Sequence, residues 1–302
     1  MGNKLLFIGS LMVDMVCPIS AFPKPGAGVV SEDFSLSLGG CAFNAAHAAQ
    51  QAGADCFLLA PLGQGPFANF ISGQLEAFGL KPLQVETTMD CGAAVCLVQP
   101  SGERTMITLP GVERHFEGSW FEGFDASDFD WAYLCGYELA GQGGEHILDF
   151  LESNPHMQVV FGPGPVVGQI SEDRIQRINK LRPIWHLNEV ESARFTGTAD
   201  IEAAGRQLEL AARNYVIITE GPKGAHLFCR GKHSLVPTQP VRAIDTIGAG
   251  DNHIGVLMAC LSQGKDLEQA TAMANRISGG VCCVKGSILT DERFNALLPT
   301  PN

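Results

Sequence analysis

Short apolar segments alternate with longer helix-compatible stretches along most of this 302-residue chain. This alternation constrains the fold more than any other feature, because strands that take turns with helices form a largely parallel sheet with helices on its faces. The expected strands are 4–8, 56–61, 95–98, 132–134, 159–161, 184–187 and 216–219, and the expected helices are 44–52, 67–78, 144–152, 171–180 and 201–212. The sequence therefore predicts an α/β fold with a mostly parallel central sheet flanked by helices.

Two stretches, about 12–38 and 91–108, depart from this alternation and are expected to lie outside the main sheet. The second reads CGAAVCLVQPSGERTMITL, two extended runs around a polar turn at Pro100–Gly102, which is the pattern of a β-hairpin. We expect both stretches to form a small sheet that covers a site as a lid. No linker rich in Pro, Gly or Ser divides the chain, so we expect residues 1–302 to form one domain.

Composition excludes several classes of partner and site. Asp and Glu number 32 against 20 Lys and Arg, a formal net charge of −12 without a long basic block, which argues against nucleic acid and membrane partners. Apolar runs stay shorter than the roughly 18 residues of a membrane span, and Asp14 interrupts the N-terminal one, so a cytoplasmic protein is expected. The ten cysteines are scattered without a zinc-site spacing, which indicates buried, reduced thiols and no structural metal.

One motif near the C-terminus has the composition of a phosphoryl-transfer loop. In AIDTIGAGDNHIG (243–255), the small residues Gly248, Ala249 and Gly250 stand between two carboxylates, and an apolar run follows. Small residues let backbone N–H groups approach an anion, and the positive end of the following helix favours negative charge there. Asp251 would then accept the proton of an attacking hydroxyl, although the helix end is expected to lower its pKa. A strand-to-helix loop capped by Asp251 explains this segment equally well when it is taken alone.

A pair of glycines near the N-terminus comes just before an Ala-rich helix. In LGGCAFNAAHAAQQAG, Gly39 and Gly40 permit close approach of a ligand to the backbone, and Asn44 offers a polyol both a donor and an acceptor. Tight packing of the helix on the sheet, with Asn44 in solvent, is the alternative. This segment alone favours the packing explanation.

Two further segments follow expected strands. In HLNEVES, Asn188 and Glu191 have the spacing of a helix-capping box, which accounts for both residues without a ligand. In EGPKGA, Gly221 and Gly224 open space at the end of a strand, either for nucleotide phosphates or for a simple turn. Each segment alone leaves both interpretations open.

Together these four segments have the order and approximate spacing of the ribokinase (PfkB) family of carbohydrate and nucleoside kinases, and the resemblance covers nearly the whole chain. The family's N-terminal signature is matched over 39–63 and its C-terminal signature over 245–255. Within the family the chain resembles most a branch of uncharacterised sugar kinases, which share PLGQG (61–65) and turns like PSGERT (100–105). The resemblance implies a ribokinase-like fold, with a mostly parallel central sheet and a small β-sheet lid.

The resemblance also implies an ATP-dependent kinase that phosphorylates a hydroxyl group of a sugar, sugar acid or nucleoside. Asp251 is the implied catalytic base, and the amides of Gly248, Ala249 and Gly250 are the implied anion hole. The other implied site residues are Asp14, Gly39, Gly40 and Asn44 for the substrate; Asn188, Glu191, Thr219, Gly221, Gly224 and Asn275 for the nucleotide; Glu191 for Mg²⁺; and Asp245 and Ile247 for a monovalent cation such as K⁺.

Several positions differ from the family pattern, and they concern the substrate more than the reaction. Cys41 stands where ribokinases proper carry Lys, so ribose is not the favoured acceptor. Asn252 and His253 replace the small residue and Phe that many members carry, and Val256 stands where Ala or Gly is expected. The loop FGPGP (161–165) lacks the Asp and Arg that relatives often place there.

Arg104 on the expected lid hairpin is a candidate substrate ligand for a charged or highly hydroxylated molecule, and a solvated arginine is the alternative. A lid sheet can pair across a dimer, which makes a homodimer through the lid a further expectation. A non-catalytic sugar or nucleoside sensor on the same fold is the alternative function, but Asp251, Gly248 and Gly250 are all present. A nicotinamide-dependent oxidoreductase would need GxGxxG after the first strand, where the chain reads IGSLMVD.

Overall fold

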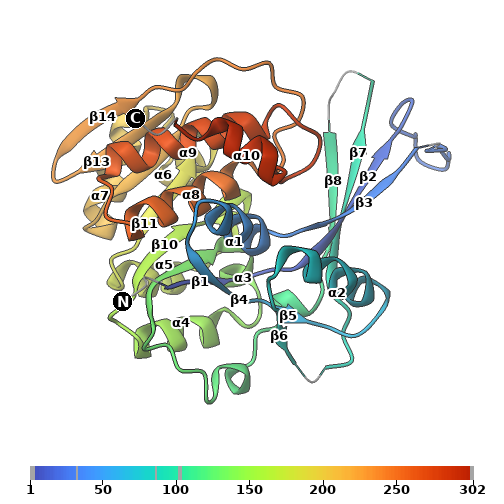
Figure 1. Ribbon diagram of the computed structural model, residues 1–302, viewed down its shortest axis with the longest axis horizontal. Helices are drawn as coiled ribbons and strands as arrows, with labels where there is room; N and C mark the ends of the chain where they lie inside the picture. Colours follow the sequence, from blue (N-terminus) through green and yellow to red (C-terminus); the bar gives the residue numbers. More distant parts are fainter. Residues whose placement is uncertain (1–3, 32, 86, 101–103, 300–302) are drawn as a thin grey trace.

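An eight-stranded sheet forms the centre of the computed structural model, which describes residues 4–31, 33–85, 87–100 and 104–299 (Figure 1). Across the sheet the strands are β14 (Lys232–Val236), β13 (Ala225–Cys229), β12 (Val216–Thr219), β11 (Ile184–Asn188), β10 (Gln158–Gly162), β9 (Phe129–Cys135), β1 (Lys4–Ile8) and β4 (Asp55–Leu59). Every neighbouring pair from β12 to β4 is parallel, and β13 pairs antiparallel with both β12 and β14. The predicted mostly parallel sheet is therefore confirmed.

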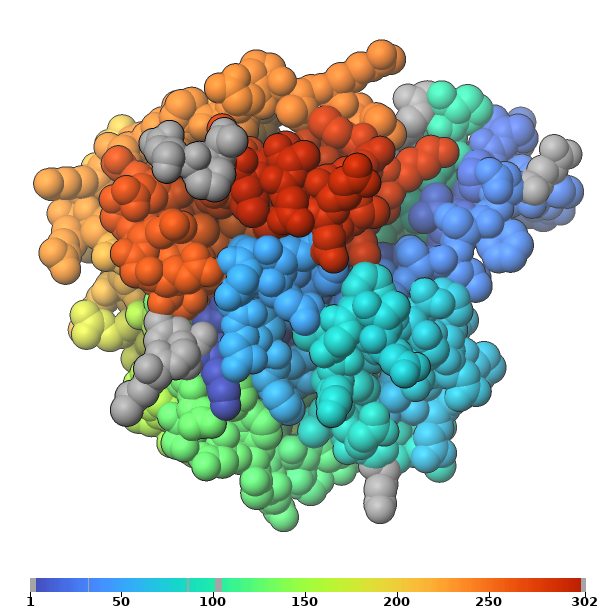
Figure 2. Space-filling view, in the orientation of Figure 1, coloured from blue at the N-terminus to red at the C-terminus, as the bar shows by residue number. Residues whose placement is uncertain are grey.

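Helices cover both faces of this sheet. They are α1 (Cys41–Gln51), α2 (Pro66–Phe78), α3 (Gly136–Ala140), α4 (Gly144–Ser153), α5 (Glu172–Lys180), α6 (Glu189–Thr196), α7 (Ile201–Ala212), α8 (Ala249–Ser262), α9 (Leu267–Val281) and α10 (Asp291–Leu297), with 3₁₀ turns at Val112–Arg114, Gly118–Phe121, Gly164–Gln169 and Gly221–Lys223. Within β1, Leu5 and Phe7 pack with α1, α2, α8, α9 and α10, whereas Leu6 and Ile8 pack with α4, α5 and α7. Because side chains alternate along a strand, β1 separates two hydrophobic cores. Figure 2 shows the first face, where the orange and red C-terminal helices lie against α1 in blue.

A second sheet stands apart from the central one and projects from the body of the molecule (Figure 1). Its strands, in order, are β3 (Ser35–Gly39), β2 (Met12–Pro18), β7 (Gly92–Val98) and β8 (Arg104–Leu109). The expectation of a small separate sheet from 12–38 and 91–108 is confirmed, although the first stretch supplies two short strands with a long connection between them. Of the expected turn at Pro100–Gly102, residues 101–103 lie outside the described part of the chain. A third, two-stranded sheet pairs β5 (Pro61–Leu62) with β6 (Leu83–Gln84).

The boundaries of two predicted elements are corrected by the structure. The helix expected over 44–52 begins at Cys41, because Gly40 takes a positive φ of 108° and lets the helix start directly after the glycine pair. The strand expected over 56–61 ends at Leu59, and Pro61 pairs instead with Leu83 in the small third sheet.

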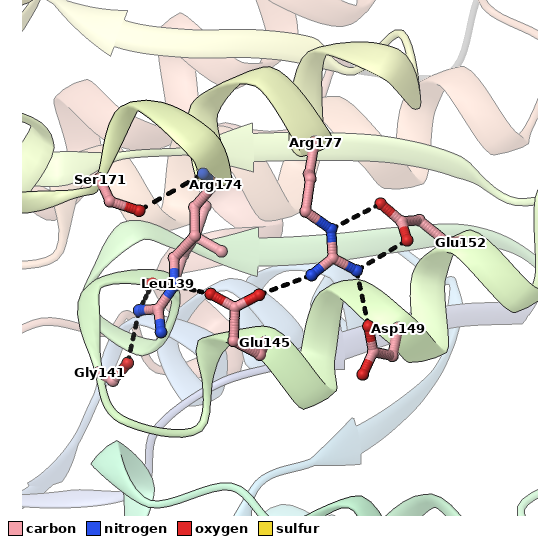
Figure 3. A network of polar contacts seen from close by, with 8 residues as sticks. All are labelled: Leu139, Gly141, Glu145, Asp149, Glu152, Ser171, Arg174 and Arg177. Carbon is pink, nitrogen blue, oxygen red and sulfur yellow. Dashed lines mark hydrogen bonds and ion pairs between the residues drawn. The ribbon is translucent and has the colours of Figure 1, made fainter.

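Charged side chains join α4 to α5 in the network of Figure 3. Arg177 donates to Glu145, Asp149 and Glu152 over 2.6–2.9 Å. Arg174 binds Glu145 as well and donates to the carbonyl oxygens that end α3. Both arginines are mostly buried at their side chains, with exposures of 17% and 18%, and their guanidinium groups bind to carboxylates and carbonyl groups within the protein.

A close contact between helices brings α1 against α8. A Cβ atom at Gly255 of α8 would overlap the carbonyl oxygen of Ala45 in α1, so only glycine permits this distance between the helices. The contact matters for the site described below, because α1 carries Asn44 and α8 carries Asp251.

Gly255→Ala is expected to lower the free energy of unfolding by about 1–3 kcal/mol, because the added methyl group must push α8 away from α1. Gly73→Ala is the matched control: Gly73 lies in α2 with open space at its Cβ, and alanine there should stabilise by about 0.5–1 kcal/mol. Urea unfolding followed by circular dichroism measures both values. Equal stabilities of the two variants would contradict the close contact.

Candidate active site

The sequence motifs converge at the carboxyl ends of the parallel strands, which is the usual position of a site in an open α/β sheet. Asn188 ends β11, Thr219 ends β12 beside it in the register, and the loop after β14 carries Asp245 and the start of α8. Gly39 ends β3 of the small sheet, so the two sheets meet where α1 begins.

Asn44 and Asp251 form the central contact of the site. The Asn44 Nδ2 donates to the Asp251 Oδ2 at 2.9 Å, and the Asn44 Oδ1 accepts from the Ser287 hydroxyl at 2.9 Å. The alternative in which Asn44 is solvated is therefore wrong, because Asn44 is only 3% exposed and both ends of its amide are used. Ser287 had no motif to mark it in the sequence, and only the fold brings it to Asn44.

The start of α8 has the backbone geometry of an anion site. Gly248 is its N-cap residue with a left-handed φ of 72°, and a Cβ there would collide with Ser287. Asn252 donates from Nδ2 to the carbonyl oxygens of Gly248 and Ser287, which fixes this turn from below. The Ala249 amide makes a long hydrogen bond of 3.3 Å to the Thr246 carbonyl, which an anion would replace, and the first amides of a helix in general lack partners within the helix.

The Asp251 carboxyl has a pKa raised to about 7, chiefly because burial penalises its charged form. Hydrogen bonds from Asn44 and Cys41 lower the pKa, and the nearby charges of Asp14 and Glu191 raise it. The net pKa of Asp251 is therefore raised and not lowered as the helix N-terminus alone would predict, because desolvation is the largest contribution. A pKa near neutrality suits a general base better than an ordinary aspartate does.

Asp14 lies on β2 with its carboxylate against Gly39, where any side chain would overlap it. Burial, followed by the charge of Asp245, raises the pKa of Asp14 to about 6. A Cβ at Gly40 would collide with the carbonyl oxygen of Ser10, so close packing against backbone requires glycine at position 40, whereas Gly39 makes room for the Asp14 side chain at the start of α1. The packing explanation for the glycine pair is therefore correct, and it also brings Asp14 near the Asp251 carboxyl.

Asp245 is buried and holds two loops together. Its Oδ1 accepts from the Ile247 amide at 2.9 Å and its Oδ2 accepts from the Gly286 amide at 3.1 Å. Both oxygens of this carboxylate are thus bound by backbone amides of two different loops.

Asn188 and Glu191 form the capping box that their spacing allowed. The Asn188 Oδ1 accepts from the Glu191 amide at 2.8 Å, and the Glu191 Oε2 accepts from the Asn188 amide at 3.1 Å. Burial raises the pKa of Glu191, and its charge acts on Asp251, so the cap lies within electrostatic range of the base. Mg²⁺ in phosphate-transfer sites commonly binds one or two carboxylates together with substrate phosphates, and a single Glu191 fits that arrangement.

The EGPKGA segment makes a tight turn between β12 and β13. Gly221 begins the 3₁₀ turn with a φ of 49°, and Gly224, with a φ of 110°, passes too close to the Val236 carbonyl for any Cβ. The Thr219 hydroxyl donates to the Leu187 carbonyl at 3.3 Å. The two glycines are therefore explained by the turn itself. The backbone of this loop lies beside the end of β11.

Asn275 is part of a buried hydrogen-bonded chain. Its Oδ1 bonds the Nε2 of His253 at 3.0 Å, its Nδ2 donates to the Val236 carbonyl at 2.9 Å, and His253 Nδ1 bonds His186 Nε2 at 2.8 Å. Burial lowers the pKa of His253 to about 4, so the chain is uncharged near neutral pH. His253, which differs from the family pattern, thus connects α8 to β11 and α9.

Cysteines around the base were missed as site residues. Cys41 and Cys135 lie close enough to one another to shift each other's pKa, and the Cys41 thiol acts to lower the pKa of Asp251. Burial of Glu138 nearby raises the pKa of that carboxyl to about 8. The substitution of Cys41 for Lys was visible in the sequence, but the partners at Cys135 and Glu138 follow an apolar strand without a recognisable motif. Arg104 begins β8, and its side chain lies outside the described part of the structure.

Comparison with known proteins agrees with this geometry. The model of the pfkB family carbohydrate kinases matches residues 3–293. The chain belongs to the pfkB family of carbohydrate kinases. It is thus a kinase that phosphorylates a hydroxyl group.

The chain is also similar to individual pfkB-family proteins along nearly its full length. It is 30% identical to the uncharacterised sugar kinase YegV of Escherichia coli, over 99% of this chain and 95% of that protein. The crystal structure of ribokinase from Thermotoga maritima superposes with a TM-score of 0.83 at 24% identity, over 98% and 99% of the two chains. A nucleoside kinase from Burkholderia thailandensis, solved with inosine, superposes with a TM-score of 0.78 at 19% identity, over 97% and 95%.

These comparisons confirm the predicted family and the ribokinase-like fold. In the described part of this pfkB-family chain, the helices are all too short or too polar to cross a membrane.

Asp251→Asn is expected to raise the thermal stability of the ligand-free protein at about pH 8 and to leave it unchanged below about pH 4. Because the folded-state pKa is raised above the ordinary value of 3.8, the ionised carboxylate destabilises the fold, and this effect grows as the pH rises toward 7. Differential scanning fluorimetry across this range gives the melting temperatures. Asp130→Asn at an exposed position of β9 is the matched control and should show no such trend. An equal melting temperature for Asp251→Asn and the wild type at alkaline pH would contradict the buried charge.

Proposed function

We propose that this chain transfers the γ-phosphoryl group of ATP to a hydroxyl group of a sugar, sugar acid or nucleoside. In this proposal residues 1–302 form one kinase domain that acts in the cytoplasm. The observation that carries it is the partly buried Asp251 carboxylate, held by Asn44 at the N-terminus of α8, beside the turn at Gly248.

The proposed reaction proceeds by in-line attack of the acceptor oxygen on the γ-phosphorus. A new oxygen–phosphorus bond forms, the bond from the γ-phosphorus to the bridging oxygen breaks, and ADP leaves with the electron pair. Asp251 accepts the proton of the hydroxyl, and the amides of Gly248, Ala249 and Gly250 stabilise the charge on the transferring group. The Asn44 amide holds the carboxylate so that its free oxygen faces the acceptor.

The proposed acceptor site lies between the lid sheet and the start of α1. Asp14, Gly39, Gly40 and Asn44 would hold the acceptor, with Arg104 at the edge of the lid. The carboxylate and amide groups of Asp14 and Asn44 suit the hydroxyl groups of a polyol, which both donate and accept hydrogen bonds.

The proposed nucleotide site follows the ends of β11 and β12. Asn188, Glu191, Thr219, Gly221, Gly224 and Asn275 would line it. Glu191 would hold Mg²⁺ with the phosphates, and Asp245 with the Ile247 carbonyl would hold K⁺. A bound Mg²⁺ neutralises the charge of the phosphates during transfer.

The lid also supports a proposed homodimer. Leu36, Met106, Ile107 and Leu109 lie on lid strands and are between 41% and 53% exposed. Apolar side chains gathered on strands that project from the body are typical of a surface that pairs with a second copy.

Asp251→Asn is expected to reduce kcat on the true acceptor by about 10²- to 10⁴-fold, because the variant lacks the general base. Binding of ATP should stay nearly unchanged, because Asp251 faces the acceptor. An ATP-consumption screen against ketoses, aldoses, keto-deoxy sugar acids and nucleosides, with and without potassium, identifies the acceptor. Asp130→Asn serves as the control with wild-type turnover. Turnover of Asp251→Asn close to the wild-type rate would exclude the proposed base, and a wild type that binds sugar without turnover would indicate a sensor.

The value of kcat/KM is expected to rise with pH up to about 7 and then to level off, since Asp251 must be ionised to accept a proton. The rise should be tenfold per pH unit on the acid side if a single group governs it. Asn44→Ala should move this rise to higher pH, because the hydrogen bond from Asn44 lowers the pKa of Asp251. A profile that is flat from about pH 5 to 8 would contradict the assignment of the base.

A further inference from the structure

A pocket of about 970 Å³ lies at the amino ends of the parallel strands, whereas Asp251 lies at their carboxyl ends. The ends of α5 and α7, the starts of β10 and β12 and the turn between β13 and β14 line it. Its charged lining residues are Arg182, Arg206, Arg213, Arg230 and a single carboxylate, Glu209. A pocket with this excess of positive charge stands out in a chain whose net charge is −12.

Three of these arginines have a backbone conformation that suits glycine. Arg182, Arg213 and Arg230 have φ values of 53°, 54° and 50°, and they are the only non-glycine residues with positive φ in the described part of the chain. This conformation costs a non-glycine residue about 1–2 kcal/mol. Elsewhere the chain places glycine in it, as at Gly79 and Gly197 at the ends of α2 and α6.

Hydrogen bonds fix the backbone at all three positions. The Arg182 carbonyl accepts from Asn214 Nδ2 at 2.7 Å and from Gln158 Nε2 at 3.3 Å. The Arg213 amide donates to the Glu209 carbonyl at 2.8 Å, and the Glu209 Oε1 accepts from the Gly231 amide, next to Arg230, at 2.8 Å. The three guanidinium groups are thus attached to turns whose backbone is held in place from within the pocket.

The favourable position of a positive charge at a helix C-terminus explains only some of these arginines. Arg182 and Arg213 follow the C-termini of α5 and α7, where a positive charge gains about 0.3–1 kcal/mol, which at most offsets the backbone cost. Arg230 lies in a hairpin turn, where no helix end contributes.

These guanidinium groups also differ in their partners from the arginines of α7 and α5 nearby. Arg206 has Glu202 and Glu209 at 3.5 Å, but Arg182, Arg213 and Arg230 have no ion pair among the described residues. Arg174 and Arg177 on the neighbouring helix, by contrast, bind carboxylates, and Arg174 also binds carbonyl groups (Figure 3).

We propose that this pocket is a second binding site, for a small molecule that carries at least two phosphate groups. Arginines from separate segments line one concave surface, and a guanidinium group can bind a phosphate through two parallel hydrogen bonds. The volume lies within the range of about 300–1,000 Å³ that is typical of small-molecule sites. A nucleoside polyphosphate and a sugar bisphosphate share the required chemistry, and the experiment below separates them.

The test compares the wild type with the triple variant Arg182→Gly, Arg213→Gly and Arg230→Gly. Glycine adopts the three backbone conformations readily, so the variant should fold with a melting temperature equal to or above that of the wild type, and its basal kinase rate should match that of the wild type. The triple variant Lys24→Ala, Lys81→Ala and Lys265→Ala changes the net charge equally at exposed positions outside this pocket.

Isothermal titration calorimetry with inorganic pyrophosphate, ATP and fructose 1,6-bisphosphate in separate arms measures the binding. For at least one of these probes, the wild type and the lysine variant are expected to bind one more molecule per chain than the glycine variant does. Where the number of bound molecules is equal, their affinity should be higher by on the order of tenfold. Asp251→Asn should keep this extra site, which separates it from the proposed active site. The arm that shows the difference identifies the ligand class. Equal binding by the wild type and the glycine variant in all three arms, or equal losses in the lysine variant, would overturn the proposal.

Discussion

The hydrogen bond between Asn44 and Asp251 joins side chains that are 207 residues apart in the chain, and the rest of the site depends on it. It requires α1 and α8 to approach so closely that Gly255 has no room for a side chain beside Ala45. The same approach buries the Asp251 carboxyl, and burial raises its pKa toward neutrality. The close approach of α1 and α8 therefore determines both the position of Asp251 and its raised pKa.

Burial of acidic groups destabilises the site in the absence of ligands. Asp14, Glu138 and Asp251 all have pKa values raised by desolvation, so each ionised form is less favourable here than in water. Such strain persists only where the surrounding fold over-determines it. Here the fold does so through the Asn252 amide, which holds both the turn before α8 and the loop of Ser287. The proposed cations and the acceptor hydroxyl groups would relieve part of this unfavourable charge.

Much of the fold and part of the site could be predicted from the sequence. The alternation of apolar segments with helix-compatible stretches predicted the parallel strands and most of their helices. The glycine pair, the spacing of Asn188 and Glu191 and the loop of Asp251 indicated the candidate site. Ser287, Cys135 and His186 could not be found in this way, because each acquires its role only through a neighbour that is distant in the chain. The sign of the pKa shift at Asp251 also required the structure, since local sequence shows the helix end but not the degree of burial. The β13–β14 hairpin was not predicted, because its short strands carry histidines and a lysine among the apolar residues.

The two ends of the central sheet carry opposite charge, and helix direction explains why. In a parallel α/β sheet the helices begin near the carboxyl ends of the strands and finish near their amino ends, so partial positive charge lies at one edge and partial negative charge at the other. The edge of Asp251 gathers carboxylates at helix starts, and the opposite edge gathers arginines at helix ends. An anion at the arginine edge would face the unfavourable ends of α5 and α7, so a single phosphate on one arginine would gain little. Several guanidinium groups around one ligand can exceed that penalty, which is why the geometry favours a ligand with more than one phosphate group.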